Sequence, residues 1–97
     1  RHVLAAAIRA NADAIVTFNQ KDFPDEALAP YDIEIIHPDD FIVYQIEFSP
    51  EKTCEAFKRQ RETKHRPPLT VEDMLNILRR CGLPQTALML ERYQNII

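Results

Sequence analysis

Apolar helix-forming and β-branched segments alternate in the first half of the chain. Residues 1–12 are rich in alanine and predict a helix that is buried on most sides. The apolar run 14–18 predicts a strand covered on both faces, and residues 33–36 predict a second strand. Pro38 then suits the first position of another helix. This order of elements predicts an α/β fold with parallel strands.

The second half of the chain predicts helices only. Ser49 is expected to cap a polar helix that has Pro50 at its first position and runs to about His65, where two prolines follow. Thr70 caps the next helix and Gly82 ends it. The last helix starts at Leu83–Pro84. The apolar positions of these last two helices are expected to face inward, and they are Val71, Met74, Leu75, Leu78, Cys81, Leu88, Met89, Tyr93 and either Ile96 or Ile97.

These patterns divide the chain into an α/β part, residues 1–48, and an all-helical extension, residues 49–97. Two strands do not make a stable parallel sheet, so further strands are expected before Arg1, on another chain or in a swapped partner. No capping residue precedes the first helix, and the chain begins with Arg rather than Met. We therefore expect a piece of a larger protein that forms a homo-oligomer or associates with a missing amino-terminal half.

Composition narrows the class of protein. The chain has 97 residues, 45% hydrophobic and 28% charged, which excludes collagen-like, disordered and disulfide-scaffold proteins. No apolar run approaches the roughly 20 residues of a membrane span, and no signal-peptide pattern is present. Cys54 and Cys81 have no second cysteine or histidine at ligand spacing, which favours free, buried thiols in a reducing cytosol. A cytoplasmic location is the prediction.

Charge is unevenly distributed. Residues 1–48 hold three basic and nine acidic side chains, whereas residues 49–97 hold nine basic and six acidic ones. A cation-binding region beside an anion-contacting region would give this asymmetry, and so would two solvated surfaces. The five cations of the densest basic run could contact phosphates or simply face solvent, and they are Lys58, Arg59, Arg61, Lys64 and Arg66.

One carboxylate is placed where chemistry is expected. Asp22 lies in a loop just past the carboxyl end of the first predicted strand, and ligands bind at this position in open α/β sheets. Thr17 and Asn19 stand at the same strand end and offer hydrogen-bonding groups. An aspartate that only shapes the turn remains the alternative.

Other acids and histidines fit structural roles better. Asp13 precedes the strand and lies at its opposite end, and His2 falls on the buried helix. His37 with Asp39 and Asp40 has the composition of a metal cluster, but helix capping and the helix dipole also account for these residues.

The stretches RHVLAAAIRANADAIVTFNQKDFP and LAPYDIEIIHPDDF resemble the carboxy-terminal half of the bacterial PIN domain, of the kind found in toxins of toxin-antitoxin modules. PPLTVEDMLNILRRCGLP is similar to the helical extension of some members. The resemblance implies a partial three-layer PIN-like fold and a metal-dependent endoribonuclease that acts on RNA and pairs with an antitoxin protein.

The family gathers about four acids around one or two Mg²⁺ or Mn²⁺ ions, and such hard cations prefer oxygen ligands. The resemblance implies that Asp22 is the last of these acids and that Thr17 and Asn19 position metal-bound water. The other acids would lie immediately before Arg1 and further upstream, so the 97 residues alone are expected to be inactive.

A non-catalytic interaction module is the competing interpretation. In it, the amphipathic helical tail would dock a partner through Met74, Leu75, Leu78, Met89 and Tyr93.

Overall fold

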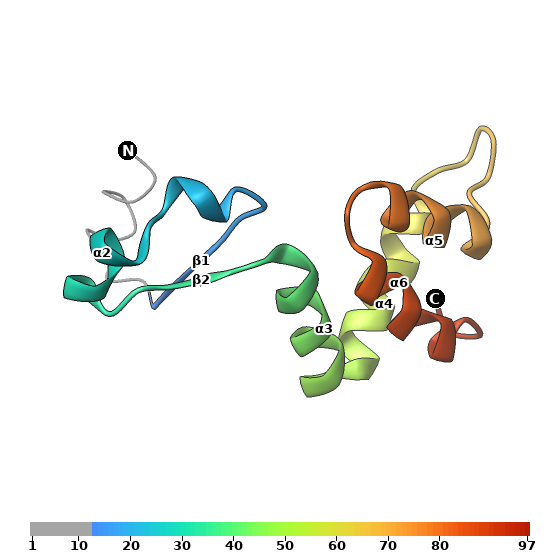
Figure 1. The fold of residues 1–97 in the computed structure, drawn as a ribbon. Coiled ribbons are helices and arrows are strands. Elements are labelled where there is room, and N and C mark those ends of the chain that lie inside the picture. Colours follow the sequence, from blue (N-terminus) through green and yellow to red (C-terminus); the bar gives the residue numbers. More distant parts are fainter. Residues whose placement is uncertain (1–12) are drawn as a thin grey trace. The chain divides into compact units, whose positions relative to one another are not determined.

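The computed structural model describes residues 13–97. The predicted first helix and His2 lie outside these residues. Contacts divide the chain into a first unit that ends at Pro38 and a second unit, Asp39–Ile97. The first unit carries the strands and the second carries helices (Figure 1). The chain is therefore a partial α/β fold followed by a helical region, as the sequence predicts.

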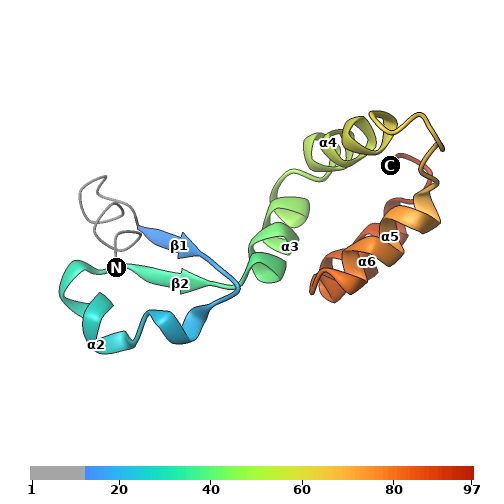
Figure 2. The same ribbon diagram turned by 90° about the horizontal axis from the view of Figure 1, so that it is seen from above.

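Two parallel strands form the sheet of the first unit. Strand β1 (Ala14–Val16) pairs with β2 (Glu34–Ile36), with Ile15 opposite Ile35. Figure 2 shows both arrows pointing the same way. The crossover between them contains a short helix, α2 (Asp25–Leu28). The parallel pairing predicted for this part of the chain is confirmed.

A small apolar core lies beside this sheet, formed by Ile15, Phe23, Leu28 and Ile33. Successive residues of a strand point to opposite faces, and Val16 is 42% exposed. The prediction that the first strand is covered on both faces is therefore wrong for this structure. The run of apolar residues continues beyond the strand itself, which ends at Val16.

The second unit contains four helices, which start where the sequence predicts. Pro38, Pro50 and Pro84 each occupy a first helical position, and Thr70 caps the third helix through a reciprocal pair of hydrogen bonds with Asp73. The helices are α3 (Pro38–Phe48), α4 (Pro50–Glu62), α5 (Val71–Arg80) and α6 (Pro84–Leu90). No helix of residues 13–97 is long and apolar enough to cross a membrane.

The core of the second unit draws on all four helices and on the chain end. Its buried residues are Ile46, Cys54, Met74, Leu75, Ala87, Leu90 and Ile97. Leu78, Met89 and Tyr93 are half-buried and pack against it. Leu88, predicted to face inward, is exposed instead, because α6 turns Ala87 and Leu90 to the core.

A buried carboxylate joins α3 to α6. Asp39, in the first turn of α3, is only 5% exposed and accepts hydrogen bonds from the backbone N–H groups of Gln85 (2.9 Å) and Thr86 (2.8 Å). Its carboxylate also accepts from the Thr86 hydroxyl at 2.7 Å. The residue before α6, Leu83, offers no capping side chain. Asp39 therefore caps α6 from a distant part of the sequence.

Every first-turn donor of α6 is thereby accounted for. Pro84 has no N–H, Gln85 and Thr86 donate to Asp39, and Ala87 donates to the carbonyl of Leu83 at 3.1 Å. This link groups α3 with the other helices. Contacts divide the chain after Pro38, and the domain boundary between residues 48 and 49 that the sequence pattern gives stays a prediction.

We predict that Asp39→Ala lowers the free energy of unfolding by about 3 kcal/mol, because it leaves two backbone N–H groups and a hydroxyl in the interior without their acceptor. Asp40→Ala is the matched control. Asp40 shares the first turn of α3 but is exposed, so its loss should cost less than about 1 kcal/mol. Urea denaturation measures both, and equal losses would contradict the buried cap.

The two thiols should differ in reactivity. Burial raises the pKa of the Cys54 thiol, which lowers its thiolate fraction at neutral pH, whereas Cys81 is exposed. A thiol reagent should modify Cys81 rapidly and Cys54 only after unfolding. The pKa of Cys54 is higher in the folded chain than in the unfolded chain. The free energy of unfolding should therefore be unaffected by this thiol below the ordinary thiol pKa of about 8.5 and should fall as the pH rises beyond it. Rapid labelling of a Cys81→Ser chain would contradict this assignment.

Candidate functional site

The loop after β1 has a fixed backbone. The N–H of Thr17 donates to the carbonyl of Ile36 at 3.0 Å, which extends the sheet pairing by one residue. The Thr17 hydroxyl then accepts the N–H of Asn19 at 3.0 Å, and the Asn19 carbonyl accepts the N–H of Asp22 at 3.1 Å. Thr17, Asn19 and Asp22 therefore form one chain of hydrogen bonds at the strand end.

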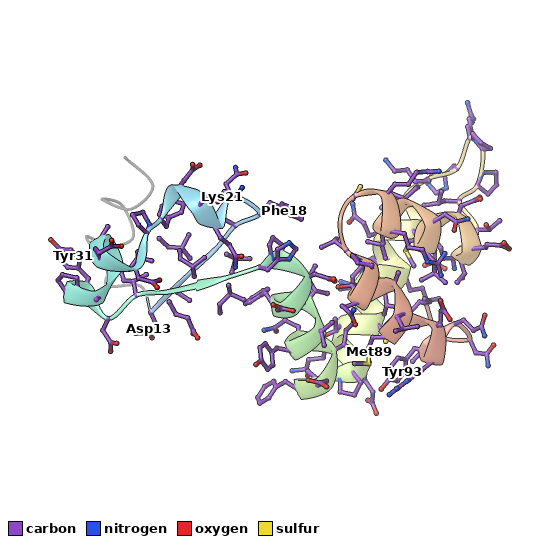
Figure 3. The ribbon with its side chains drawn as sticks, viewed as in Figure 1. Asp13, Phe18, Lys21, Tyr31, Met89 and Tyr93 are labelled. Atoms are coloured by element: carbon purple, nitrogen blue, oxygen red, sulfur yellow. The ribbon has the colours of Figure 1, made fainter. Side chains whose placement is uncertain are left out.

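A buried phenylalanine anchors this loop. Asp22 ends a 3-10 turn, Gln20–Asp22, and Phe23 directly follows it into the core of the first unit. Because Phe23 is held inside, the exposed Asp22 next to it is kept at the surface of the loop. Figure 3 shows Phe18 and Lys21 on this loop, with Asp13 at the other end of the strand. Asp13 is thus remote from the loop, as the sequence predicts.

The end of the second strand contributes to the same edge. His37 follows β2 directly, and its ring meets the exposed ring of Phe18 edge-on, with centroids 5.3 Å apart and planes at 86°. Aromatic pairs prefer this geometry. Both strands run in the same direction, so their carboxyl ends bring Thr17, Asn19, Asp22 and His37 to one edge of the sheet.

The described residues do not form a complete metal site. No group of three or more histidine, cysteine, aspartate or glutamate side chains within residues 13–97 is placed to hold a metal ion. Asp39, which the sequence groups with His37 and Asp40, is engaged as the cap of α6. Asp22 supplies one carboxylate at the sheet edge, and a hard divalent cation needs several oxygen ligands. Any further ligands would have to come from beyond the described residues.

The five cations of the basic run fall into three environments. Lys58 and Arg59 are exposed on α4, where Arg59 pairs with Glu55 at 3.0 Å. Such an exposed pair contributes little to stability. The helix ends at Glu62, earlier than the predicted His65, so Lys64 and Arg66 lie in the loop that follows. The run is therefore not one continuous helix face.

Arg61 has structural contacts within this run. It is half-buried, its Nε donates to the main-chain oxygen of Ile97 at 2.8 Å, and its Nη1 donates to the carbonyl of Leu69 at 3.0 Å. These bonds join the end of α4 to the loop before α5 and to the last residue. Its predicted role in contacting phosphate stays a prediction, and its two hydrogen bonds give it a positioning role.

The stripe expected to dock a partner is engaged in the core. Met74 and Leu75 are buried, and Leu78, Met89 and Tyr93 pack against the same cluster. Amphipathic spacing predicts which side of a helix is apolar but does not distinguish a core from a docking surface. Met74 and Leu75 are therefore not exposed for docking, and docking through the half-buried Leu78, Met89 and Tyr93 stays a prediction.

The role of Asp39 as the cap of α6 was not predicted from the sequence. Its own helix explains an acid in the first turn, so the pattern gives no reason to look further. The signal lies instead at Leu83, an apolar residue in the capping position of a helix that starts with proline. Such a helix start, when it is buried, needs an acceptor from elsewhere, and here a polar side chain from a distant part of the sequence supplies it.

The helices of the second unit match a known family. A family model described as the VapC50 C-terminal domain matches residues 38–92, more than half of the chain and almost the same residues as the second unit. The chain belongs to this family.

A curated relative extends the similarity. The chain is 45% identical over 78 residues to a protein of Mycobacterium tuberculosis (strain ATCC 25618 / H37Rv) named "Putative ribonuclease VapC50". The match covers 80% of this chain and 46% of that protein, so the chain spans about half the length of the curated relative. No solved structure matches the chain.

We predict that Phe23→Ala and Phe18→Ala differ in their effects on stability. The two phenylalanines flank the same loop, but Phe23 is buried in the core and Phe18 is exposed. Removing the Phe23 ring should cost about 3 kcal/mol or more. Removing the Phe18 ring should cost no more than about 1.5 kcal/mol, the value of its contact with His37. Thermal or urea unfolding compares the variants, and similar losses would show that Phe23 does not anchor the loop.

Proposed function

We propose that this chain is the carboxy-terminal part of a metal-dependent endoribonuclease of PIN type, the toxin of a toxin-antitoxin pair that acts on RNA in the cytoplasm. The observation that carries the proposal is the ordered loop at the carboxyl end of β1, where Thr17, Asn19 and Asp22 are linked by hydrogen bonds. Membership of the VapC50 C-terminal domain family and the similarity to a protein named as a ribonuclease support it.

Asp22 is the proposed metal ligand. It is exposed at the sheet edge, and its carboxylate is the kind of hard oxygen donor that Mg²⁺ or Mn²⁺ prefers. In the complete protein a bound divalent cation would polarise the scissile phosphate and lower the pKa of an attacking water. One carboxylate does not hold such an ion, so upstream acids are required. The chain alone is therefore expected to be inactive.

Thr17 and Asn19 are proposed to position the loop and water near Asp22. The Thr17 hydroxyl accepts the Asn19 N–H and thereby fixes the turn that leads to Asp22. The Asn19 side chain is exposed at the same edge, where its amide offers both a donor and an acceptor. Thr17→Ser should keep the turn because it retains the hydroxyl, whereas Thr17→Val removes it at similar volume.

The competing module hypothesis is less well supported by the chain. Two of its five docking residues, Met74 and Leu75, are buried in the core of the second unit, and the other three pack against that core. An antitoxin partner remains part of the proposed function, because toxins of this kind pair with one. Self-association of the chain also stays a prediction.

We predict that Asp22→Asn in the complete protein lowers RNA cleavage by several orders of magnitude and leaves folding intact. The substitution keeps the shape of the side chain and removes the charge that would hold the metal. Asp25→Asn is the matched control, since Asp25 is exposed in the first turn of α2, three positions further along. A labelled RNA, assayed with Mg²⁺ and with Mn²⁺, gives the rates, and circular dichroism tests the fold.

Two outcomes contradict the assignment. One is full-rate cleavage by Asp22→Asn, and the other is metal-dependent RNA cleavage by the 97-residue chain alone. Added Mg²⁺ or Mn²⁺ should also leave the melting temperature of this chain nearly unchanged, because binding stabilises a fold only when the ligand set exists.

A further inference from the structure

A pocket of about 380 Å³ lies between α5 and the loop that joins it to α4. Figure 1 shows this loop in yellow to orange. A volume in this range suits a small organic group such as a nucleobase. The pocket is distant in sequence from the loop that carries Asp22, and nothing in the proposed function uses it.

The lining of the pocket is largely apolar. Pro67, Pro68 and Leu69 contribute to it from the loop, and Ile77 contributes from α5. Leu69 is half-buried, whereas Ile77 is 37% exposed, so this apolar surface is open to a ligand. Proline rings and branched aliphatic side chains give a surface on which a planar base can lie.

Three consecutive residues, Lys64, His65 and Arg66, add positive charge and planar groups to the lining. All three are exposed. Histidine rings and arginine guanidinium planes stack on unpaired RNA bases, and lysine and arginine contact phosphates. Asp73 is the one acid of the lining, and its carboxylate accepts the N–H of Thr70 at 3.3 Å.

The pocket is pre-formed by contacts that hold its loop. Arg61 binds the Leu69 carbonyl at 3.0 Å, an isolated antiparallel bridge joins His65 to Pro68, and the capping box of α5 fixes the residue that follows Leu69. A pocket that does not need to be ordered on binding loses less conformational entropy when it takes a ligand. Arg61 thus acts as a positioning residue for this loop.

We propose that this pocket binds single-stranded RNA, with one base against the apolar lining and the adjoining phosphates at Lys64 and Arg66. The proposal rests on the proposed function, since RNA is the substrate there, and adds a binding site outside the cleavage site. An acidic peptide would use the cations but would not need the apolar surface beside them. The observed combination therefore favours a nucleotide chain.

The test measures binding of a fluorescein-labelled single-stranded RNA, too short to form a hairpin, by fluorescence anisotropy over a series of salt concentrations. The complete protein carries Asp22→Asn so that the probe is not cut. Lys64→Ala with Arg66→Ala should weaken binding roughly ten-fold and reduce the salt slope by about 1 to 1.5. Ile77→Glu should weaken binding to a similar degree, because it puts a negative charge on the apolar lining.

Lys52→Ala with Arg80→Ala is the matched control, because it removes the same charge from exposed positions outside the basic run and outside the pocket. Its affinity should stay within about two-fold. Equal weakening by both pairs would overturn the pocket, because it would indicate diffuse attraction. Unchanged RNA affinity in the pocket variants would overturn it as well, even if they lost binding to an acidic peptide.

The two proposals fail separately. If the complete protein with its natural Asp22 does not cut RNA, the proposed function fails whatever the anisotropy shows. If it cuts RNA normally and the pocket variants bind the probe as tightly as the parent, only the pocket fails. Unfolding midpoints of each variant, equal to the parent, confirm that the comparison reports binding rather than loss of fold.

Discussion

The carboxylate of Asp39 is the interaction on which the helical unit depends. Removing an ionised group from water is costly unless it is fully hydrogen-bonded, and Asp39 meets this condition by accepting two backbone N–H groups and the Thr86 hydroxyl. Thr86 is fully buried, and its N–H and hydroxyl are both satisfied by the Asp39 carboxylate. The link fixes how α6 meets α3 and turns Ala87 and Leu90 toward the shared core.

The candidate cleavage site and the proposed RNA pocket are built by similar means. In each, one buried or half-buried side chain holds a polar loop: Phe23 anchors the turn that ends in Asp22, and Arg61 holds the loop that carries Lys64 and Arg66. Neighbouring hydrogen bonds then fix the backbone, so exposed functional groups are held without being buried themselves. Pre-ordering of this kind would lower the entropy lost on binding at the two proposed sites.

Much of the fold could be predicted from local signals. The parallel strands and the starts of α3, α4, α5 and α6 follow from β-branched runs, prolines and a capping threonine, all of which act within one turn. Contacts between distant residues could not be predicted in this way. Tertiary packing determines the hydrogen bond from Thr86 to Asp39 and the bonds from Arg61 to Leu69 and Ile97. It also determines that the apolar stripe of the helices packs in the core. The position of the loop that carries Asp22, just past the end of β1, follows from a strand end, which is itself a local feature, whereas its role as a metal site stays a prediction.

The central claim is that a divalent metal binds at the carboxyl end of β1 in the complete protein. Paramagnetic line broadening by Mn²⁺ tests it most directly, because the effect reports distance from the ion. At low Mn²⁺ concentration the amide signals of Asn19 and Asp22 should broaden first and recover when Mg²⁺ is added in excess. Broadening centred elsewhere, or equal broadening in a protein that carries Asp22→Asn, would contradict the claim.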